Sequence, residues 1–365
     1  MQKNILFTVL VLFITLSIQS QTKSYSLKAN LDNIKLNMNG NELEEKLPFS
    51  TQKSDTLLIQ LGFESLDLRL DTDMDSVRLF LKKDQSAFVS IQKEGMRPLL
   101  LKICNGVDLL NIGFDVTSQN TELKFAYEKN INNPYLQRLR TDYSLDSITA
   151  PAKNDIERVQ LVSSWVHNLW QHDGYNQPAK NDALYILEEV KKGERFRCVE
   201  YGIVTTACLN ALDLPSRTLS LKTKDAETTP SGAGHVVMEV FLKDMKKWIM
   251  VDPQMDAIPF SEGVPLNAVE FQKVMTDKKE LTVESSDPEF SQAQYEAWIY
   301  PYLYYFSYPF DNRENMPADK VIRYKGKTQI MLVPKGAKNP TVFQIKYPIN
   351  NCIYTNSILD FYNIP

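Results

Sequence analysis

Residues 196–252 limit the possible folds of this chain more than any other stretch, because they place three reactive side chains at the ends of three predicted elements. Cys198 begins an apolar run without an internal proline, which predicts a mostly buried helix. His235 and Asp252 stand at the start of one short apolar run and at the end of another, and both runs are typical of strands. The predicted elements are a helix over 199–212, a strand over 236–242 and a strand over 248–251.

These three side chains form the set that a cysteine nucleophile needs. A free thiol is mostly protonated at neutral pH, and a nearby imidazole or a helix N-terminus lowers its pKa. Cys198 lies at a predicted helix N-terminus, where the helix dipole stabilises an anion by roughly 0.3–1 kcal/mol. If the two strands form a hairpin, they lie about 4.8 Å apart, and Asp252 can then accept a hydrogen bond from His235. We expect Cys198 to be the nucleophile, His235 the base and Asp252 the group that orients the base.

Four local patterns in this stretch carry a family resemblance. They are the Cys198 segment that opens a helix, the run Ala211-Leu212-Asp213-Leu214-Pro215-Ser216-Arg217, the strand from Gly234-His235 to Glu239-Val240, and Trp248 four residues before Asp252-Pro253. Together with the order cysteine, histidine, aspartate, they resemble the transglutaminase-like (papain-related) superfamily, in an exported bacterial type. The resemblance covers about residues 155–256, less than a third of the chain. It implies a transglutaminase-like core of the cysteine-protease type that carries the triad Cys198, His235 and Asp252.

The chain departs from the family pattern at two positions beside the triad. Arg197 stands where the family often has glycine, Val237 stands where it often has an aromatic residue, and the Gly-Gln-Cys-Trp segment of crosslinking transglutaminases is absent. The resemblance therefore supports the fold and the triad better than it supports the crosslinking reaction. We expect acyl transfer from a peptide or protein amide, with hydrolysis favoured. The alternatives are transamidation, release of asparagine-linked glycans by the same triad, and a catalytically silent binding module.

The pattern outside this stretch predicts an α+β chain with several parts. Short alternating runs separated by turn-forming clusters indicate a β-sandwich before the core. Helices are expected over 155–170, 182–192, 266–275 and 290–299, and strands in the tail over 329–333, 342–347 and 353–361. The expected organisation is a β-sandwich over 21–130, a connector over 131–154, a catalytic domain over 155–280 and a small β-rich C-terminal extension over 281–365.

Residues 1–20 have the pattern of a signal peptide. Lys3 gives the positive start, Ile5 to Ile18 form an apolar core, and Ser17 and Ser20 are small residues before a cut near Gln21. Fourteen helical residues span roughly 21 Å, which is too short for a hydrocarbon core of about 30 Å, although an uncleaved anchor is the alternative. We expect a periplasmic or secreted protein with no membrane attachment after cleavage.

Composition excludes one large class of partner. The formal net charge is −4, with 41 basic and 45 acidic residues interleaved, so there is no basic stripe for nucleic acid. Four cysteines in an exported chain raise the question of disulfides. A bond between Cys104 and Cys352 is conceivable, but two buried free thiols are expected, and Cys208 is expected on a buried helix face. The oligomeric state is open.

Three other features invite a functional interpretation. The run Asp71-Thr72-Asp73-Met74-Asp75 lacks the glycine and glutamate of a calcium-binding EF-hand loop, so we expect an acidic turn. His167 and His172 have no partner at metal-ligand spacing, so we expect no metal site, and no cofactor motif is present. The aromatic run 300–310 is expected to form a packed surface between domains, with a sugar-binding or peptide-binding face as the alternative.

Overall fold

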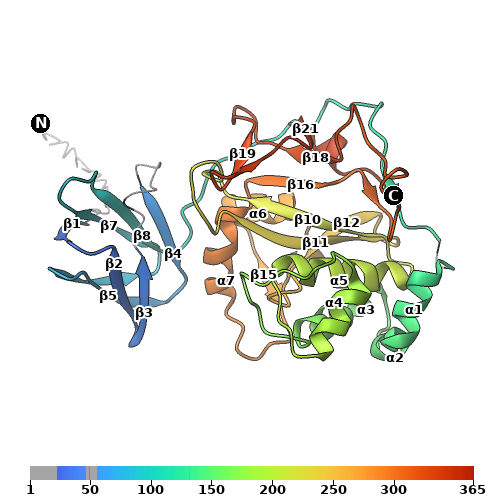
Figure 1. Cartoon of the computed structure of the whole chain (residues 1–365), viewed down its shortest axis with the longest axis horizontal. Coiled ribbons are helices and arrows are strands. Elements are labelled where there is room, and N and C mark those ends of the chain that lie inside the picture. Colours follow the sequence, from blue (N-terminus) through green and yellow to red (C-terminus); the bar gives the residue numbers. More distant parts are fainter. Residues whose placement is uncertain (1–22, 47–48, 50–55, 131) are drawn as a thin grey trace, which may run out of the picture.

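A computed structural model describes residues 23–46, 49, 56–130 and 132–365. The signal peptide expected at residues 1–20 lies outside the described residues. Figure 1 shows two regions side by side, an N-terminal β-region and a larger mixed α/β region that ends with the C-terminus. No helix in the described ranges is long and apolar enough to cross a membrane.

The N-terminal region is a β-sandwich, as predicted. One sheet has the strand order β1 (Lys23–Lys28), β7 (Gln85–Gln92), β8 (Leu99–Asn105), β4 (Leu57–Leu61). The other sheet has the order β3 (Asn41–Lys46), β2 (Asn33–Met38), β5 (Ser65–Asp71), β6 (Ser76–Lys82). Every second residue of β5 and β7 points into a shared core, as Leu66, Leu68 and Leu70 do in β5 and Val89 does in β7.

The mixed region is built on one six-stranded sheet. Its strand order is β12 (Lys247–Val251), β11 (Gly234–Leu242), β10 (Ser216–Lys222), β16 (Tyr305–Pro309), β18 (Gln329–Leu332), β21 (Cys352–Thr355). Residues after 281, which were expected as a small extension, therefore supply three strands of the same sheet that carries the histidine strand. Pairing of β10 with β16 joins the two halves at Ser220 opposite Ser307.

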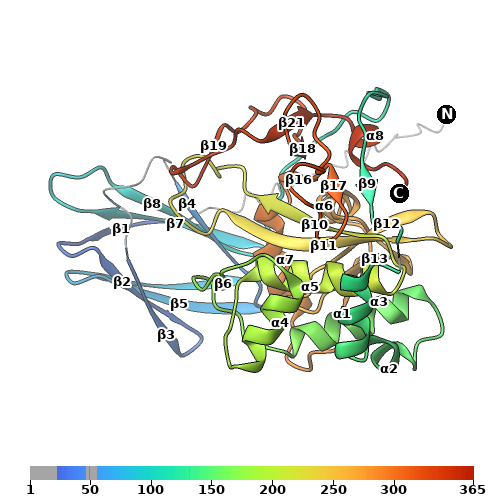
Figure 2. The ribbon, with the colours of Figure 1, turned by 45° about the vertical axis from the view of Figure 1, so that its right-hand side comes forward.

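Helices α1 to α5 cover one face of this sheet (Figure 2). They are α1 (Pro134–Asp142), α2 (Leu145–Thr149), α3 (Asp155–His167), α4 (Ala183–Lys191) and α5 (Cys198–Ala211). The first two occupy most of the expected connector. Pro134 is compatible with this helix, because it stands in the first turn of α1, where a backbone N–H would have no partner within the helix. The Asn133 side chain caps the helix. Leu136, Leu139 and Leu145 are buried in the core beneath the sheet.

The opposite face of the sheet is covered by later elements. These are the helices α6 (Ala268–Thr276) and α7 (Gln292–Ile299), the 3₁₀ turn Tyr300–Tyr302, and a small sheet of β14 (Val264–Pro265), β13 (Ile258–Ser261) and β15 (Thr282–Glu284). Most of the aromatic run 300–310 is buried in this core, including Phe306, Tyr308 and Phe310. The run is therefore mainly part of the hydrophobic core on this face of the sheet, and the expectation of a packed surface between domains does not describe most of it.

Several short segments differ from the sequence expectations. The sandwich was expected to extend to residue 130, but its last strand ends at Asn105, and residues 106–130 contain only the short strand β9 (Ala126–Tyr127), which pairs with β17 (Asp311–Asn312). The strand expected over 342–347 is a short ladder of β19 (Val342–Phe343) and β20 (Tyr347–Pro348). The end of the strand expected over 353–361 is helix α8 (Ile358–Phe361), because the Ser357 side chain accepts a hydrogen bond from Asp360 N and caps the turn.

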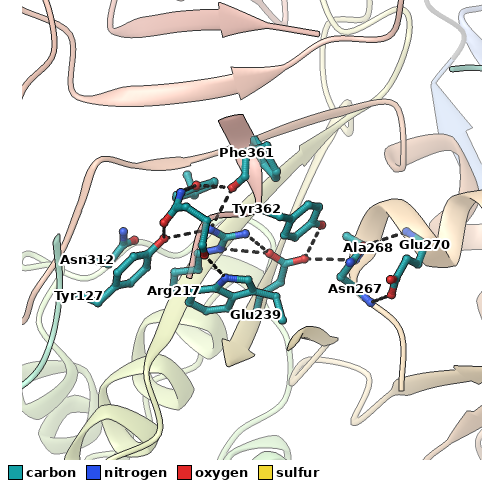
Figure 3. Close-up of polar contacts among 12 residues, drawn as sticks. Tyr127, Arg217, Glu239, Asn267, Ala268, Glu270, Asn312, Phe361 and Tyr362 are labelled. Atoms are coloured by element: carbon teal, nitrogen blue, oxygen red, sulfur yellow. Dashed lines mark hydrogen bonds and ion pairs between the residues drawn. The ribbon is translucent and has the colours of Figure 1, made fainter. Parts of the chain in front are cut away.

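A buried ion pair ties the C-terminal segment to the sheet (Figure 3). Arg217 of β10 and Glu239 of β11 are opposite each other, both are fully buried, and Nη2 lies 2.6 Å from Oε2. Arg217 also donates to the Tyr127 hydroxyl and to the Phe361 carbonyl, and the Tyr362 hydroxyl donates to Glu239 Oε1 at 2.7 Å. The charges thus have hydrogen-bond partners on all sides, as buried charges require.

Candidate active site

Helix α5 holds Cys198 in its first turn against strand β11. Gly202, one turn later, faces β11 so closely that a Cβ there would lie 3.1 Å from Val236 Cγ1. A glycine at this position permits the close approach of helix and strand, and it brings the half-buried Cys198 to the start of β11. At the helix start, Glu200 is fully buried and accepts hydrogen bonds from the backbone N–H and the guanidinium of Arg197.

His235 and Asp252 meet at the open end of the β11–β12 hairpin. The last paired residues are Met238 and Val251, so Asp252 comes beside Val237, on the strand face that His235 also occupies. His235 Nε2 lies 2.9 Å from Asp252 Oδ2. Because an ionised carboxylate only accepts, Nε2 carries the proton and Nδ1 remains for another partner. Asp252 is fully buried and also accepts from the Tyr295 hydroxyl at 3.2 Å.

The Cys198 thiol has three hydrogen-bond partners. Burial alone raises its pKa, but hydrogen bonds from the His172 and His235 side chains, the charge of His235 and the N–H of Val236 outweigh burial and lower the pKa to about 6. Burial likewise lowers the pKa of His235, and the charge and hydrogen bond of Asp252 outweigh it and raise the pKa to about 10. Between these values the pair is present as thiolate and imidazolium, which is the reactive form of a cysteine nucleophile.

The contact of His172 with Cys198 is a feature of the site that sequence reasoning missed. His172 is exposed, as expected of a surface or core-edge histidine, but its side chain also hydrogen-bonds to Cys198. The loop that carries it is bound to the segment before Cys198. Trp170 Nε1 and Asp173 N both donate to the Phe196 carbonyl, at 3.3 and 2.9 Å, and the Tyr201 hydroxyl donates to the Trp170 carbonyl at 2.6 Å. Nothing in the spacing between residues 172 and 198 signals this contact.

Comparison with protein families identifies the part of the chain that holds these side chains. Residues 144–253 match the model of the transglutaminase-like superfamily. They form a transglutaminase-like domain. The match contains Cys198, His235 and Asp252, and it begins earlier than the stretch in which the sequence resemblance is readable. The β-sandwich and the strands after β12 lie outside it.

Solved structures with a similar arrangement share little sequence with this chain. A candidate cysteine protease from Cytophaga hutchinsonii is 12% identical, with 49% of this chain and 62% of that chain covered and a TM-score of 0.28. A transglutaminase from red sea bream is 10% identical, with 68% and 65% covered and a TM-score of 0.25. The chain thus covers less than two thirds of either protein. A search of curated proteins gives no match.

Two aromatic side chains from outside the matched segment cover the histidine of the transglutaminase-like domain. The Trp298 ring stands edge-on to the His235 ring, with centroids 4.8 Å apart, and the Tyr302 ring lies 5.9 Å away. His235 is only 3% exposed as a result. This cover keeps water from the bond between His235 and Asp252, and a low local dielectric strengthens that bond. Both aromatic residues come from α7 and the 3₁₀ turn that follows it.

The two departures from the family pattern have structural explanations. Arg197 pairs with the buried Glu200, so it supports the start of α5. Val237 is fully buried in the core of the sheet on the face that carries α6 and α7. Neither side chain prevents contact between Cys198 and His235.

Other candidate sites contain structural residues. Among the described residues, no group of three histidine, cysteine or acidic side chains could hold a metal ion. Asp73 accepts from the N–H groups of Asn30 and Leu31 and so anchors a neighbouring loop, and His167 Nδ1 contacts the Gln254 carbonyl at 2.9 Å. The four cysteines all lie in described segments and are free, with Cys104, Cys208 and Cys352 buried.

Proposed function

We propose that this protein is a cysteine-dependent enzyme that transfers the acyl group of a peptide or protein amide, most directly to water. The nucleophile is Cys198, the general acid and base is His235, and Asp252 orients the imidazole. One observation carries the proposal. The imidazole of His235 contacts the Cys198 thiol on one side, and on the other side its Nε2 lies 2.9 Å from the buried carboxylate of Asp252. That arrangement has the geometry of a nucleophile, a base and an orienting group.

The proposed reaction has two stages. The Cys198 thiolate attacks the carbonyl carbon, and the new C–S bond gives a tetrahedral oxyanion. His235 then transfers its proton to the leaving amine, the C–N bond breaks, and a thioester remains. In the second stage His235 takes a proton from water, the hydroxide attacks the thioester, and breaking of the C–S bond releases the acid and restores the ion pair.

Two donors are available for the oxyanion. The Cys198 N–H lies in the first turn of α5, where it has no partner within the helix. The second donor in this proposal is His172, because its side chain already reaches the reacting sulfur. Preorganised donors of this kind contribute about 2.7–4 kcal/mol each to transition-state stabilisation in other enzymes.

Hydrolysis outside the cytoplasm is the specific form that we propose. The signal-peptide pattern at residues 1–20 supports export, and nothing in the site indicates a second, amine-binding position. Transamidation and glycan release use the same triad, so they are distinguished by products. In a catalytically silent binding module, by contrast, a lowered pKa of the Cys198 thiol would serve no purpose.

The test is a substrate screen of the wild type, Cys198→Ala and the control Cys104→Ala, which removes a buried thiol from the β-sandwich. Substrates are peptides, a glutamine peptide with a primary amine, cell-wall peptide fragments and an asparagine-linked glycopeptide. We expect wild type and Cys104→Ala to release an amine from at least one peptide substrate, and Cys198→Ala to release none. Equal turnover by wild type and Cys198→Ala would refute the proposal.

A further inference from the structure

A cleft of about 630 Å³ lies beside the proposed active site, between the β-sandwich and the transglutaminase-like domain. Its walls come from four parts of the chain: strand β4 with Thr56, the segment after β8 with Asp108 and Leu110, the loop that precedes His235, and the segment 297–302. Trp298 and Tyr302 belong to this lining, and they are the two rings that contact His235. Cys198 and His235 are not part of the lining, so the cleft adjoins the catalytic groups through these two rings. Its volume is within the range of about 300–1,000 Å³ found for ligand pockets.

The sandwich wall of the cleft is held firmly on α7 and the 3₁₀ turn after it, which follow the transglutaminase-like domain in the chain. Gln60 Nε2 donates to the Ala297 carbonyl at 3.2 Å, and Gly62 touches the backbone of Ala293 so closely that any Cβ would clash with it. In the segment that follows β8, the N–H of Leu110 donates to the Tyr300 hydroxyl, 2.8 Å away. Strand β4, an edge strand of its sheet, thus stands at a fixed distance from α7. A fixed wall can contribute to selectivity.

The chemistry of the walls indicates what the cleft binds. Leu58 and Leu110 line the cleft together with the two aromatic residues, and Leu58 is 39% exposed, whereas its neighbour Leu57 packs against the core of the sandwich. The loop wall contributes Lys224 and Asp225, whose charges cancel. Burial, together with the charges of Cys198 and Asp225, raises the pKa of Tyr302. Asp108 also lines the cleft and is paired with Lys102, so the charges of the lining are balanced. A mainly apolar cleft without an unpaired charge favours an uncharged side chain.

We infer that this cleft is the acyl-donor subsite and that it binds the aliphatic or aromatic side chain of a peptide residue next to the scissile carbonyl. The inference rests on the function proposed above and adds the class of substrate. It also gives the β-sandwich a role, because Leu58 of β4 supplies part of the recognition surface.

The experiment measures covalent labelling of Cys198 by two dipeptidyl chloromethyl ketones, one with phenylalanine and one with glycine next to the reactive carbonyl. In each reaction the Cys198 sulfur forms a C–S bond and chloride leaves, and mass spectrometry of the intact protein gives the rate. Iodoacetamide, which has no side chain, serves as the reference reagent. We compare the wild type, Leu58→Ser and the matched control Phe80→Ser, which changes a side chain on β6 that is 65% exposed and lies outside the cleft.

We expect the phenylalanine reagent to label the wild type at least about tenfold faster than the glycine reagent, as a hydrophobic pocket discriminates. In Leu58→Ser this ratio falls at least threefold while labelling by iodoacetamide is unchanged, and Phe80→Ser behaves as wild type. Equal rates for the two reagents, or an unchanged ratio in Leu58→Ser, overturn the inference while rapid iodoacetamide labelling leaves the catalytic proposal intact. Slow iodoacetamide labelling of the wild type at about pH 6 overturns both.

Discussion

Nε2 of His235 lies 2.9 Å from Oδ2 of Asp252, and this contact raises the pKa of the imidazole. Asp252→Asn keeps the shape of the side chain and removes its charge. The imidazolium is then lost at a lower pH, the Cys198 thiolate loses the charge that stabilises it, and kcat/KM falls by about 10²–10⁴-fold. Kinetic assays across pH measure both effects. Tyr295→Phe is the control, because it removes a hydrogen bond of 3.2 Å to the same carboxylate without altering the charge, and it should cost less than about tenfold.

The rate of Cys198 alkylation should rise with pH, and its inflection should lie at a lower pH than for an ordinary thiol. The pKa of Cys198 is lowered to about 6, so the thiolate is lost as the pH falls through that value, whereas the imidazolium of His235 persists up to about pH 10. Alkylation by iodoacetamide should therefore be half-maximal near pH 6, against about 8.5 for an ordinary thiol. Acyl transfer should be constant between these limits and decline outside them. An inflection near pH 8.5 would show that the histidines do not activate the thiol.

His172 should contribute to catalysis through a hydrogen bond. Two substitutions, His172→Ala and His172→Gln, separate this contribution from a structural role. His172→Ala removes the donor and should lower kcat by about 10²-fold with KM little changed. His172→Gln retains an N–H donor and should recover at least tenfold of that loss. A variant that lowers activity only by unfolding the loop would also lose the contact of Trp170 with Phe196, which the fluorescence of the folded protein reports. Equal activity of the alanine and glutamine variants would remove His172 from the mechanism.

The buried pair Arg217 and Glu239 should matter for stability. Arg217→Met leaves the carboxylate buried without its cation and should lower the free energy of unfolding by about 3–5 kcal/mol. The double variant Arg217→Met with Glu239→Leu should recover part of this loss, because it removes the unpaired charge. Urea denaturation gives both values. Arg138→Ala is the surface control, since its pair with Asp142 is 67% and 44% exposed and should affect stability little. A larger loss in the double variant than in Arg217→Met would contradict the argument.

The close approach at Gly202 should set the distance between the helix and the histidine strand. In Gly202→Ala the new methyl group lies 3.1 Å from Val236 Cγ1, so α5 must move away from β11 by a few tenths of an ångström. We expect slower alkylation of Cys198 at pH 6, because its hydrogen bonds to His235 and Val236 N lengthen. Ala207→Gly, on the same helix, is a control that changes helix propensity by roughly 1 kcal/mol without pushing on β11. Unchanged alkylation in Gly202→Ala would show that the helix tolerates the methyl group in place.

Local patterns were sufficient for the elements that carry the proposed triad. The apolar run after Cys198 forms α5, and the two strand-like runs form the β11–β12 hairpin, whose period-two alternation and open end bring His235 to Asp252. The caps of α4, at Asp182 and near Gly193, were also readable from their residue types. These features depend on neighbours within a few residues, so the order of residue types is enough to predict them.

The remaining features depend on contacts between segments that are far apart in the chain. The C-terminal strands join the central sheet through Ser220 and Ser307, although each strand alone is compatible with a separate small sheet. His172 reaches Cys198 because Phe196 binds its loop, and Trp298 reaches His235 because α7 packs over the sheet. The amino-acid sequence by itself determined which side chains can react and where the helix and the two strands of the proposed triad lie. The tertiary structure decided which of them meet, because packing energy depends on surfaces that only the folded chain brings into contact.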